Sequence, residues 1–220
     1  KYLDIRLSKL KQLNIPKRKK KLREVFQFYC FLAKNRNRLK KFLNKHKIPY
    51  IVTREPGGTY ISEKLRKIIL SKEYNISNHE ELMLLMASRF NHINTVIKPA
   101  LKKGKLVISD RFCDSTFVYQ CYVNGFGINN GKILHKQLLD NFLPNKTFLF
   151  LLSSNEILKR LKLRKKSNKY DNKSLNFHNK IIKGYKIISK NNSRFVTINA
   201  EKKFEEIQIE LQNKIIKIIS

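Results

Sequence analysis

The chain lacks any apolar run of about eighteen residues, the length from which a membrane-spanning helix is suspected. Its first residues are polar and basic, so we expect neither a membrane span nor a secretory signal. Cysteine is scarce as well. Cys30, Cys113 and Cys121 are spaced unlike a zinc site or a CxxC pair, which favours free thiols in a reducing compartment, with Cys113 as a small buried filler. We therefore expect a soluble, cytoplasmic protein.

Acidic residues are also few, because 16 Asp and Glu stand against 48 Lys and Arg and leave a net charge of +32. Such a charge ordinarily indicates a nucleic-acid partner. A competing cause, which we favour, is an A/T-rich gene, since Lys, Asn and Ile are all written by A/T-rich codons. Nothing resembles an RNP motif, an aromatic stacking platform or a zinc finger, so a nucleic-acid partner rests on charge alone.

Apolar runs alternate with amphipathic stretches along the chain. Hydrophobic residues make up 41% of the 220, which is enough for one sizeable core, and we favour a single domain. We predict strands at 25–33, 48–53, 106–109, 148–152 and 195–198, and helices at 35–46, 63–70, 80–101, 134–141, 177–188 and 203–218. This alternation predicts an α/β fold with a parallel sheet.

The stretch LVISDRFCDSTFVYQ at 106–120 places Asp110, Arg111 and Asp114 just after a predicted buried strand. In an open parallel sheet, groups past the carboxyl end of a central strand face the ligand crevice. Asp110 and Arg111 are therefore candidates to handle a magnesium ion and a phosphate. The alternative is an ordinary Asp–Arg pair that caps a helix beginning near Asp114.

The sequence REPGGTY at 54–60 is a turn signature between a strand and a helix. Gly57 and Gly58 let the backbone approach a ligand, and Thr59 or Ser62 can cap the following helix. A plain strand-to-helix turn is the alternative.

Arg89 falls on the apolar stripe of the helix predicted at 80–101. Its side chain either snorkels to the surface or reaches into a polar site, and we favour the site. His92, on the same stripe, reads as a partly buried histidine of the core or its edge. The basic residues of 160–169 read either as a solvated helix end or as a mobile lid that closes over phosphates.

Several motifs, read together, closely resemble the thymidylate kinases: TREPGGT at 53–59, ELMLLMASR at 81–89, IKPAL at 97–101, VISDRF at 107–112 and DSTFVYQ at 114–120. LPNKTFLFLL at 143–152, FHNKIIKGY at 177–185 and INA at 198–200 continue the resemblance. It covers about 48–220. It implies a P-loop-kinase-like, three-layer fold with a central parallel sheet and helices on both faces, in a nucleoside monophosphate kinase-like domain at 47–220.

The resemblance implies that the chain transfers the γ-phosphoryl of ATP to dTMP, giving dTDP for dTTP synthesis, with Mg²⁺ as cofactor and as a cytoplasmic homodimer. It implies catalytic roles for Arg111, for Asp110, which would hold magnesium through water, and for the lid residue Arg164. It implies dTMP binding by Arg54, Glu55, Pro56, Gly57, Leu85, Arg89, Ser115, Thr116, Tyr119 and Gln120. Lys34, Arg160, Asn199 and Ala200 would lie on the ATP side.

Leu85 departs from the family pattern, which has an aromatic residue stacked on thymine at this position. Loss of that stacking is expected to weaken base affinity by about 1 kcal/mol.

The front of the chain, 1–46, departs further. A phosphate-binding loop of the form GxxxxGKS or GxxxxGKT is expected about twenty residues before TREPGGT, but no glycine precedes Gly57 and only Lys34 could stand for its lysine. A decayed gene, a reading frame shifted or wrongly started upstream of about residue 47, and an unusual ATP loop each explain this. Bulky Phe28, Tyr29 and Phe31 favour the first two. The alternatives to a working kinase are a catalytically impaired dTMP-binding remnant and a basic RNA-associated protein.

Overall fold

Parallel strands form one sheet in the part of the chain that the computed structural model describes, residues 25–28, 41–71, 73–163, 170 and 173–219. The strands are β1 Val25–Phe28, β2 Tyr50–Arg54, β3 Leu106–Asp110, β4 Lys146–Leu151 and β5 Phe195–Asn199. They follow the spatial order β2-β3-β1-β4-β5, and each neighbouring pair is parallel. The predicted α/β fold with a parallel sheet is confirmed.

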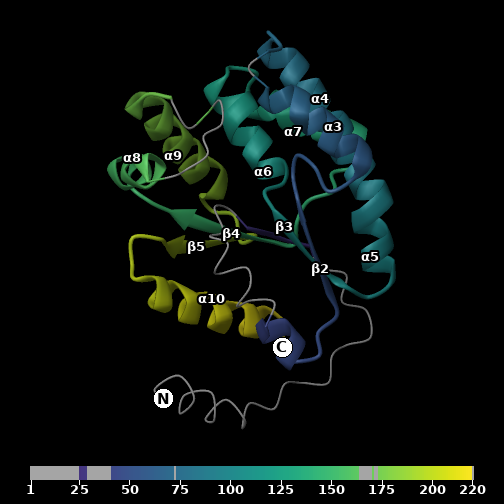
Figure 1. The fold of residues 1–220 in the computed structure, drawn as a ribbon, viewed down its shortest axis with the longest axis vertical. Helices are drawn as coiled ribbons and strands as arrows, with labels where there is room; N and C mark the ends of the chain where they lie inside the picture. Colours follow the sequence, from purple (N-terminus) through teal and green to yellow (C-terminus); the bar gives the residue numbers. More distant parts are fainter. Residues whose placement is uncertain (1–24, 29–40, 72, 164–169, 171–172, 220) are drawn as a thin grey trace.

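Helices connect the strands (Figure 1). They are α3 Tyr60–Leu70, α4 Asn78–His92, α5 Lys98–Lys102, α6 Cys113–Thr116, α7 Ile128–Leu139, α8 Ser154–Lys162, α9 Leu175–Ser189 and α10 Phe204–Ile219, with the π-helical segments η2 Ile93–Ile97 and η3 Phe117–Val123. Residues 41–45 are helical too. Within the described ranges, no helix is both long enough and apolar enough to cross a membrane.

Strand β3, which lies between β2 and β1, shows why the protein has three layers. Successive side chains of a strand point to opposite faces. Val107 packs with α4, η2, α5 and α6 in one core cluster, while Leu106 and Ile108 pack with α10 and with Phe42 in another. Figure 1 shows α10 on one side of the sheet and α4, α6, α7 and α9 on the other. The predicted arrangement of helices on both faces is confirmed.

The helix predicted at 80–101 is interrupted. It begins at Asn78, behind a capping box of Ser77 and Glu80, and its regular part ends at His92. Pro99 has no N–H to donate to the carbonyl one turn back, so the preceding turns widen into η2 before α5 continues.

The start of the helix predicted at 134–141 is wrong, because α7 begins at Ile128 and includes Gly131, which precedes the predicted range. A Cβ atom at Gly131 would lie 2.3 Å from the sulfur of Cys121, so α7 packs against η3 without a side chain there. No range was predicted for helix α8, although a helix end was one of the two readings of the basic stretch at 160–169. The strand predicted at 25–33 is seen as Val25–Phe28 and the helix predicted at 35–46 as residues 41–45; the rest of both ranges lies outside the described residues.

We expect Gly131→Ala to destabilise the protein by about 1–3 kcal/mol, because the buried Cys121 leaves no room for a methyl group and the overlap outweighs the better helix propensity of alanine. Urea denaturation measures this. Asn129→Ala, at an exposed position of the same helix, is the control and should change stability by no more than about 0.5 kcal/mol. An equally stable Gly131→Ala variant would contradict this account of the α7 packing.

Candidate active site

The carboxyl ends of β2 and β3 meet at one edge of the sheet. Arg54 and Asp110 are register partners at the ends of these strands, and the backbone N–H of Glu55 donates to the carbonyl of Asp110 at 3.0 Å. The two motifs on either side, the 54–60 turn and the segment after Asp110, are therefore adjacent.

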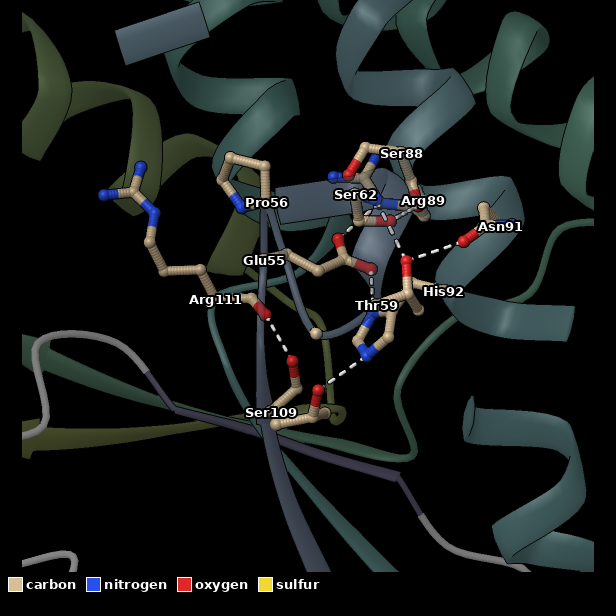
Figure 2. Close-up of polar contacts among 12 residues, drawn as sticks. Glu55, Pro56, Thr59, Ser62, Ser88, Arg89, Asn91, His92, Ser109 and Arg111 are labelled. Atoms are coloured by element: carbon tan, nitrogen blue, oxygen red, sulfur yellow. Dashed lines mark hydrogen bonds and ion pairs between the residues drawn. The ribbon is translucent and has the colours of Figure 1, made fainter. Parts of the chain in front are cut away.

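A buried carboxylate, Glu55, lies at the centre of the site (Figure 2). Its two oxygens contact Arg89 Nε at 2.7 Å and His92 Nδ1 at 3.0 Å. Because a carboxylate only accepts, His92 donates through Nδ1, and in its neutral form its Nε2 accepts from the Thr53 hydroxyl at 2.6 Å. Glu55 thus joins the end of β2 to α4. His92 is fully buried and bonded, a role that its place on an apolar stripe did not reveal.

Arg89 is only 2% exposed, so the alternative in which it snorkels to the surface is wrong. Besides Glu55, its guanidinium donates to Thr116 Oγ1 at 2.9 Å, and it lies 5.4 Å from the centre of the Phe112 ring. The structure therefore brings together three predicted dTMP-binding residues, Glu55, Arg89 and Thr116. Leu85, also predicted there, is buried on α4 one turn before Arg89.

The 54–60 turn is held by Glu63 of α3. Arg54 donates to both Glu63 oxygens, at 3.2 and 2.8 Å, and Gly58 N–H donates to one of them at 3.0 Å. The hydrogen bond from Arg54 is the main cause that lowers the pKa of the Glu63 carboxyl. Gly58 is required, because its φ is +86° and a Cβ atom there would lie 2.5 Å from Thr53 Oγ1.

Of the two candidates for the helix cap, Thr59 is the one used: its hydroxyl accepts from Ser62 N–H at 3.0 Å. The Ser62 hydroxyl donates instead to the carbonyl of Ser88 on α4. Pro56, a predicted dTMP-binding residue, accepts from Arg66 through its carbonyl. The turn is therefore tied to both α3 and α4, which fixes its position against the sheet.

Arg111 follows β3 in a left-handed conformation, with φ of 68°. Such a backbone costs a non-glycine residue about 1 kcal/mol, and the Ser109 hydroxyl supports it by donating to the Arg111 carbonyl at 2.7 Å. The Arg111 side chain donates to Ser115 Oγ at 3.0 Å and lies 4.6 Å above the ring of Tyr119. Arg111 thus contacts two more of the predicted site residues, Ser115 and Tyr119.

The alternative in which an Asp–Arg pair caps the helix near Asp114 is wrong, because α6 has no side-chain cap. Asp114 is fully buried and pairs with both terminal nitrogens of Arg194, at 2.6 and 2.7 Å, and accepts from Thr147 at 2.8 Å. Arg194, just before β5, was missed, since nothing in its local sequence links it to a residue eighty positions away. This pair fixes α6, which carries Ser115.

Cys113, beside Asp114, is fully buried, and its burial raises the pKa of its thiol well above the usual value. A thiol that stays protonated is a poor nucleophile. The expectation of a small buried filler is confirmed.

The residues predicted on the ATP side also gather. Arg160 of α8 donates to the Ala200 carbonyl at 3.0 Å and to Glu156 at 2.7 Å, and Asn199 accepts from Glu201 N–H at the same loop. Lys34 and Arg164, and with Arg164 most of the possible lid at 160–169, lie outside the described residues.

No three His, Cys, Asp or Glu side chains converge as a metal cluster among the residues that the structure describes. Asp110 alone still suits Mg²⁺, which typically keeps several waters and binds through one or two carboxylates together with substrate phosphates.

We expect Arg194→Met to destabilise the protein by about 3–5 kcal/mol, because it leaves the Asp114 charge buried without its partner. The double variant Asp114→Asn with Arg194→Met should recover part of that loss. As a control, Lys202→Met breaks the more exposed pair with Glu210 and should cost at most about 1 kcal/mol. Similar losses from both arginine and lysine variants, measured by urea denaturation, would contradict the assignment.

A parallel sheet with β1 at its centre, helices on both faces, and arginines and a carboxylate at the carboxyl ends of β2 and β3 define a P-loop-kinase-like protein of the nucleoside monophosphate kinase class. A family profile described as Thymidylate kinase matches residues 34–211. The match begins upstream of residue 48, the position from which the sequence motifs resemble the family. The chain belongs to the thymidylate kinase family.

Similar proteins support this assignment. The chain is 37% identical over 178 residues to a thymidylate kinase of Clostridium novyi, covering 77% of this chain and 87% of the relative. It is 37% identical over 185 residues to one of Mesoplasma florum, covering 83% and 88%, and 36% identical over 171 residues to one of Bacillus velezensis, covering 76% and 81%.

Proposed function

We propose that this protein transfers the γ-phosphoryl group of ATP to dTMP and releases dTDP, a step of nucleotide biosynthesis. The observation that carries the proposal is the contact of Arg111 with Ser115 and Tyr119 beside the end of β3, in a chain of the thymidylate kinase family. The comparisons lend no support to the two alternatives, a binding remnant and an RNA-associated protein.

On the acceptor side, Arg54 and the Gly57 turn bind the dTMP phosphate. The Arg54 side chain is 52% exposed, so it reaches solvent while its guanidinium group is paired with the Glu63 carboxylate. Arg89 presents its guanidinium to the thymine edge from a fixed position, because Glu55 and Thr116 hold it. Ser115, Thr116, Tyr119 and Gln120 line the base and sugar.

At the reacting centre, Arg111 stabilises negative charge that spreads over the transferring group in the transition state. Its backbone turn and its bond to Ser115 orient the side chain before substrate arrives, which lowers the reorganisation that the reaction requires. Asp110 is the residue that would hold Mg²⁺, whose chemistry is to neutralise phosphate charge. Mg²⁺ use, a cytoplasmic location and a homodimeric assembly are parts of this proposal that rest on the family alone.

A coupled assay with dTMP, ATP and Mg²⁺ tests the proposal, and we expect turnover clearly above a blank without enzyme. We expect Arg111→Ala to lower kcat by about 100-fold or more while dTMP affinity changes by about threefold or less, because the guanidinium acts mainly in the transition state. Lys102→Ala, which removes an exposed cation from α5, should leave both values near those of the wild type. Equal losses of kcat and of dTMP affinity would show instead that Arg111 binds the substrate equally in the ground state and the transition state.

The donor side yields a separate prediction. Without a glycine before Gly57, the front of the chain cannot easily present close-packed N–H groups to phosphates, since each bulky residue in a left-handed turn costs on the order of 1 kcal/mol. We expect dTMP to raise Tm measurably and ATP with Mg²⁺ to raise it little, because ATP binds weakly. The turnover expected in the coupled assay therefore requires a high ATP concentration. At about 1 mM ligand, a site of micromolar affinity would add about 4 kcal/mol. A large ATP-specific shift that survives high salt would contradict this.

A further inference from the structure

A buried carboxylate that the proposed mechanism does not use lies close to the base-binding residues. Glu81 of α4 is only 4% exposed. Its Oε1 accepts from Gln120 Nε2 of η3 at 2.5 Å and from the hydroxyl of Tyr170. A carboxylate is rarely buried without a structural or functional reason, because removing it from water is costly unless its oxygens are satisfied.

The carboxylate settles which way the Gln120 amide points. An amide has one accepting oxygen and one donating NH2 group, whereas an ionised carboxylate only accepts. The NH2 group of Gln120 must therefore face Glu81, and the amide oxygen faces away from it. Among the described residues none donates to that oxygen, so it is available as an acceptor.

The position of Gln120 relates it to the other base-side residues. Thr116, one turn before Gln120, accepts from Arg89, and Arg89 lies two turns after Glu81 on α4. Two hydrogen bonds therefore cross between the same pair of chain segments, Gln120 to Glu81 and Arg89 to Thr116. Leu85 lies on α4 midway between Glu81 and Arg89 and is buried. Glu81 thus belongs to the framework that holds the base side of the site.

We propose, on the basis of the proposed function, that Glu81 is a specificity-determining positioning residue: it fixes the Gln120 amide with its oxygen toward the base, so that the site selects pyrimidines that carry a ring N3–H. Thymine and uracil have that donor. Cytosine has an acceptor at N3, which would face the amide oxygen without a hydrogen between them. A site with a buried acceptor left unpaired rejects such an analogue by about 10-fold to 100-fold.

Tyr170 strengthens this arrangement. Its ring stacks on Phe177 at an interplanar angle of 15° and meets Tyr119 edge to face, so the hydroxyl is held against Glu81. Burial and the neighbouring Glu81 raise the pKa of Tyr170 well above its usual value, so the phenol stays protonated and remains a donor. Two donors converge on Glu81 Oε1, and the carboxylate has little freedom to rotate away from Gln120.

The first test is Glu81→Gln. An amide at position 81 offers either an oxygen or an NH2 group, so Gln120 is free to turn over. We expect the ratio of kcat/KM for dTMP to that for dCMP to fall by about 10-fold, mainly through KM, with kcat for dTMP within about threefold of the wild type. Glu80→Gln, the neighbouring exposed carboxylate of the same helix, removes the same charge and should leave the ratio unchanged.

The exchanged variant, Glu81→Gln with Gln120→Glu, is the decisive second test. It keeps the net charge and a carboxylate–amide hydrogen bond, and a carboxylate at position 120 can only accept from the base. We expect this variant to retain the preference for dTMP within about threefold of the wild type, whether or not Glu81→Gln alone folds well. Loss of the preference in the exchanged variant, or an unchanged ratio in folded Glu81→Gln, would overturn the proposal.

Dissociation constants for dTMP and dCMP, measured by calorimetry, separate this inference from the proposed function. Turnover no faster than the blank would end the proposed function, while the ratio of the two dissociation constants would still decide the role of Glu81. Equal weakening of both nucleotides in Glu81→Gln would show a purely structural role. A wild-type protein that binds dTMP and dCMP equally would also overturn the inference.

Discussion

The rest of the site depends on one interaction, the buried carboxylate of Glu55 with Arg89 and His92. Breaking a buried pair by removing one partner typically costs about 3–5 kcal/mol, because a charge is left in a dry environment. Here the same residue also donates its N–H to the Asp110 carbonyl, so it connects the end of β2, the end of β3 and α4. Any shift of the 54–60 turn would expose or separate these groups, and the cost of doing so keeps the site in one arrangement.

The other buried acids work in the same way. Asp114 holds Arg194 and Thr147 behind α6, and Glu81 holds Gln120 and Tyr170 beside η3. Each acid thereby fixes an element that carries a residue of the proposed dTMP site. Side chains locked by such partners need little reorganisation when substrate binds, which is the structural basis of precise positioning in phosphoryl transfer.

The local sequence pattern was sufficient to predict the features that depend on residues close together in the sequence. The five strands and most helices follow from periodicity. The grouping of Arg54, Arg89 and Arg111 in one site came from the resemblance to the thymidylate kinases. Contacts between distant residues left no such signal: the Asp114–Arg194 pair joins residues eighty positions apart, and Glu81 reaches Gln120 thirty-nine positions on. The predicted helix started too late, after Gly131. A glycine is needed inside α7 because the sulfur of Cys121 lies close to it, and this tertiary contact cannot be read from the local sequence. Whether Arg89 reached the surface or the site was likewise decided by packing.

The excess of basic over acidic residues is compatible with a nucleotide-binding function. Of the 16 acidic residues, Glu55, Glu81 and Asp114 are buried and hydrogen-bonded to other side chains, while 48 Lys and Arg leave the chain with an excess of +32. A field of that sign raises the local concentration of anions such as nucleotides, so a basic chain does not need a nucleic-acid partner to benefit from its charge. Salt screens this long-range attraction over about 10 Å but screens buried pairs far less. The surface charge therefore affects how fast a nucleotide arrives, whereas the buried acids determine how it is held.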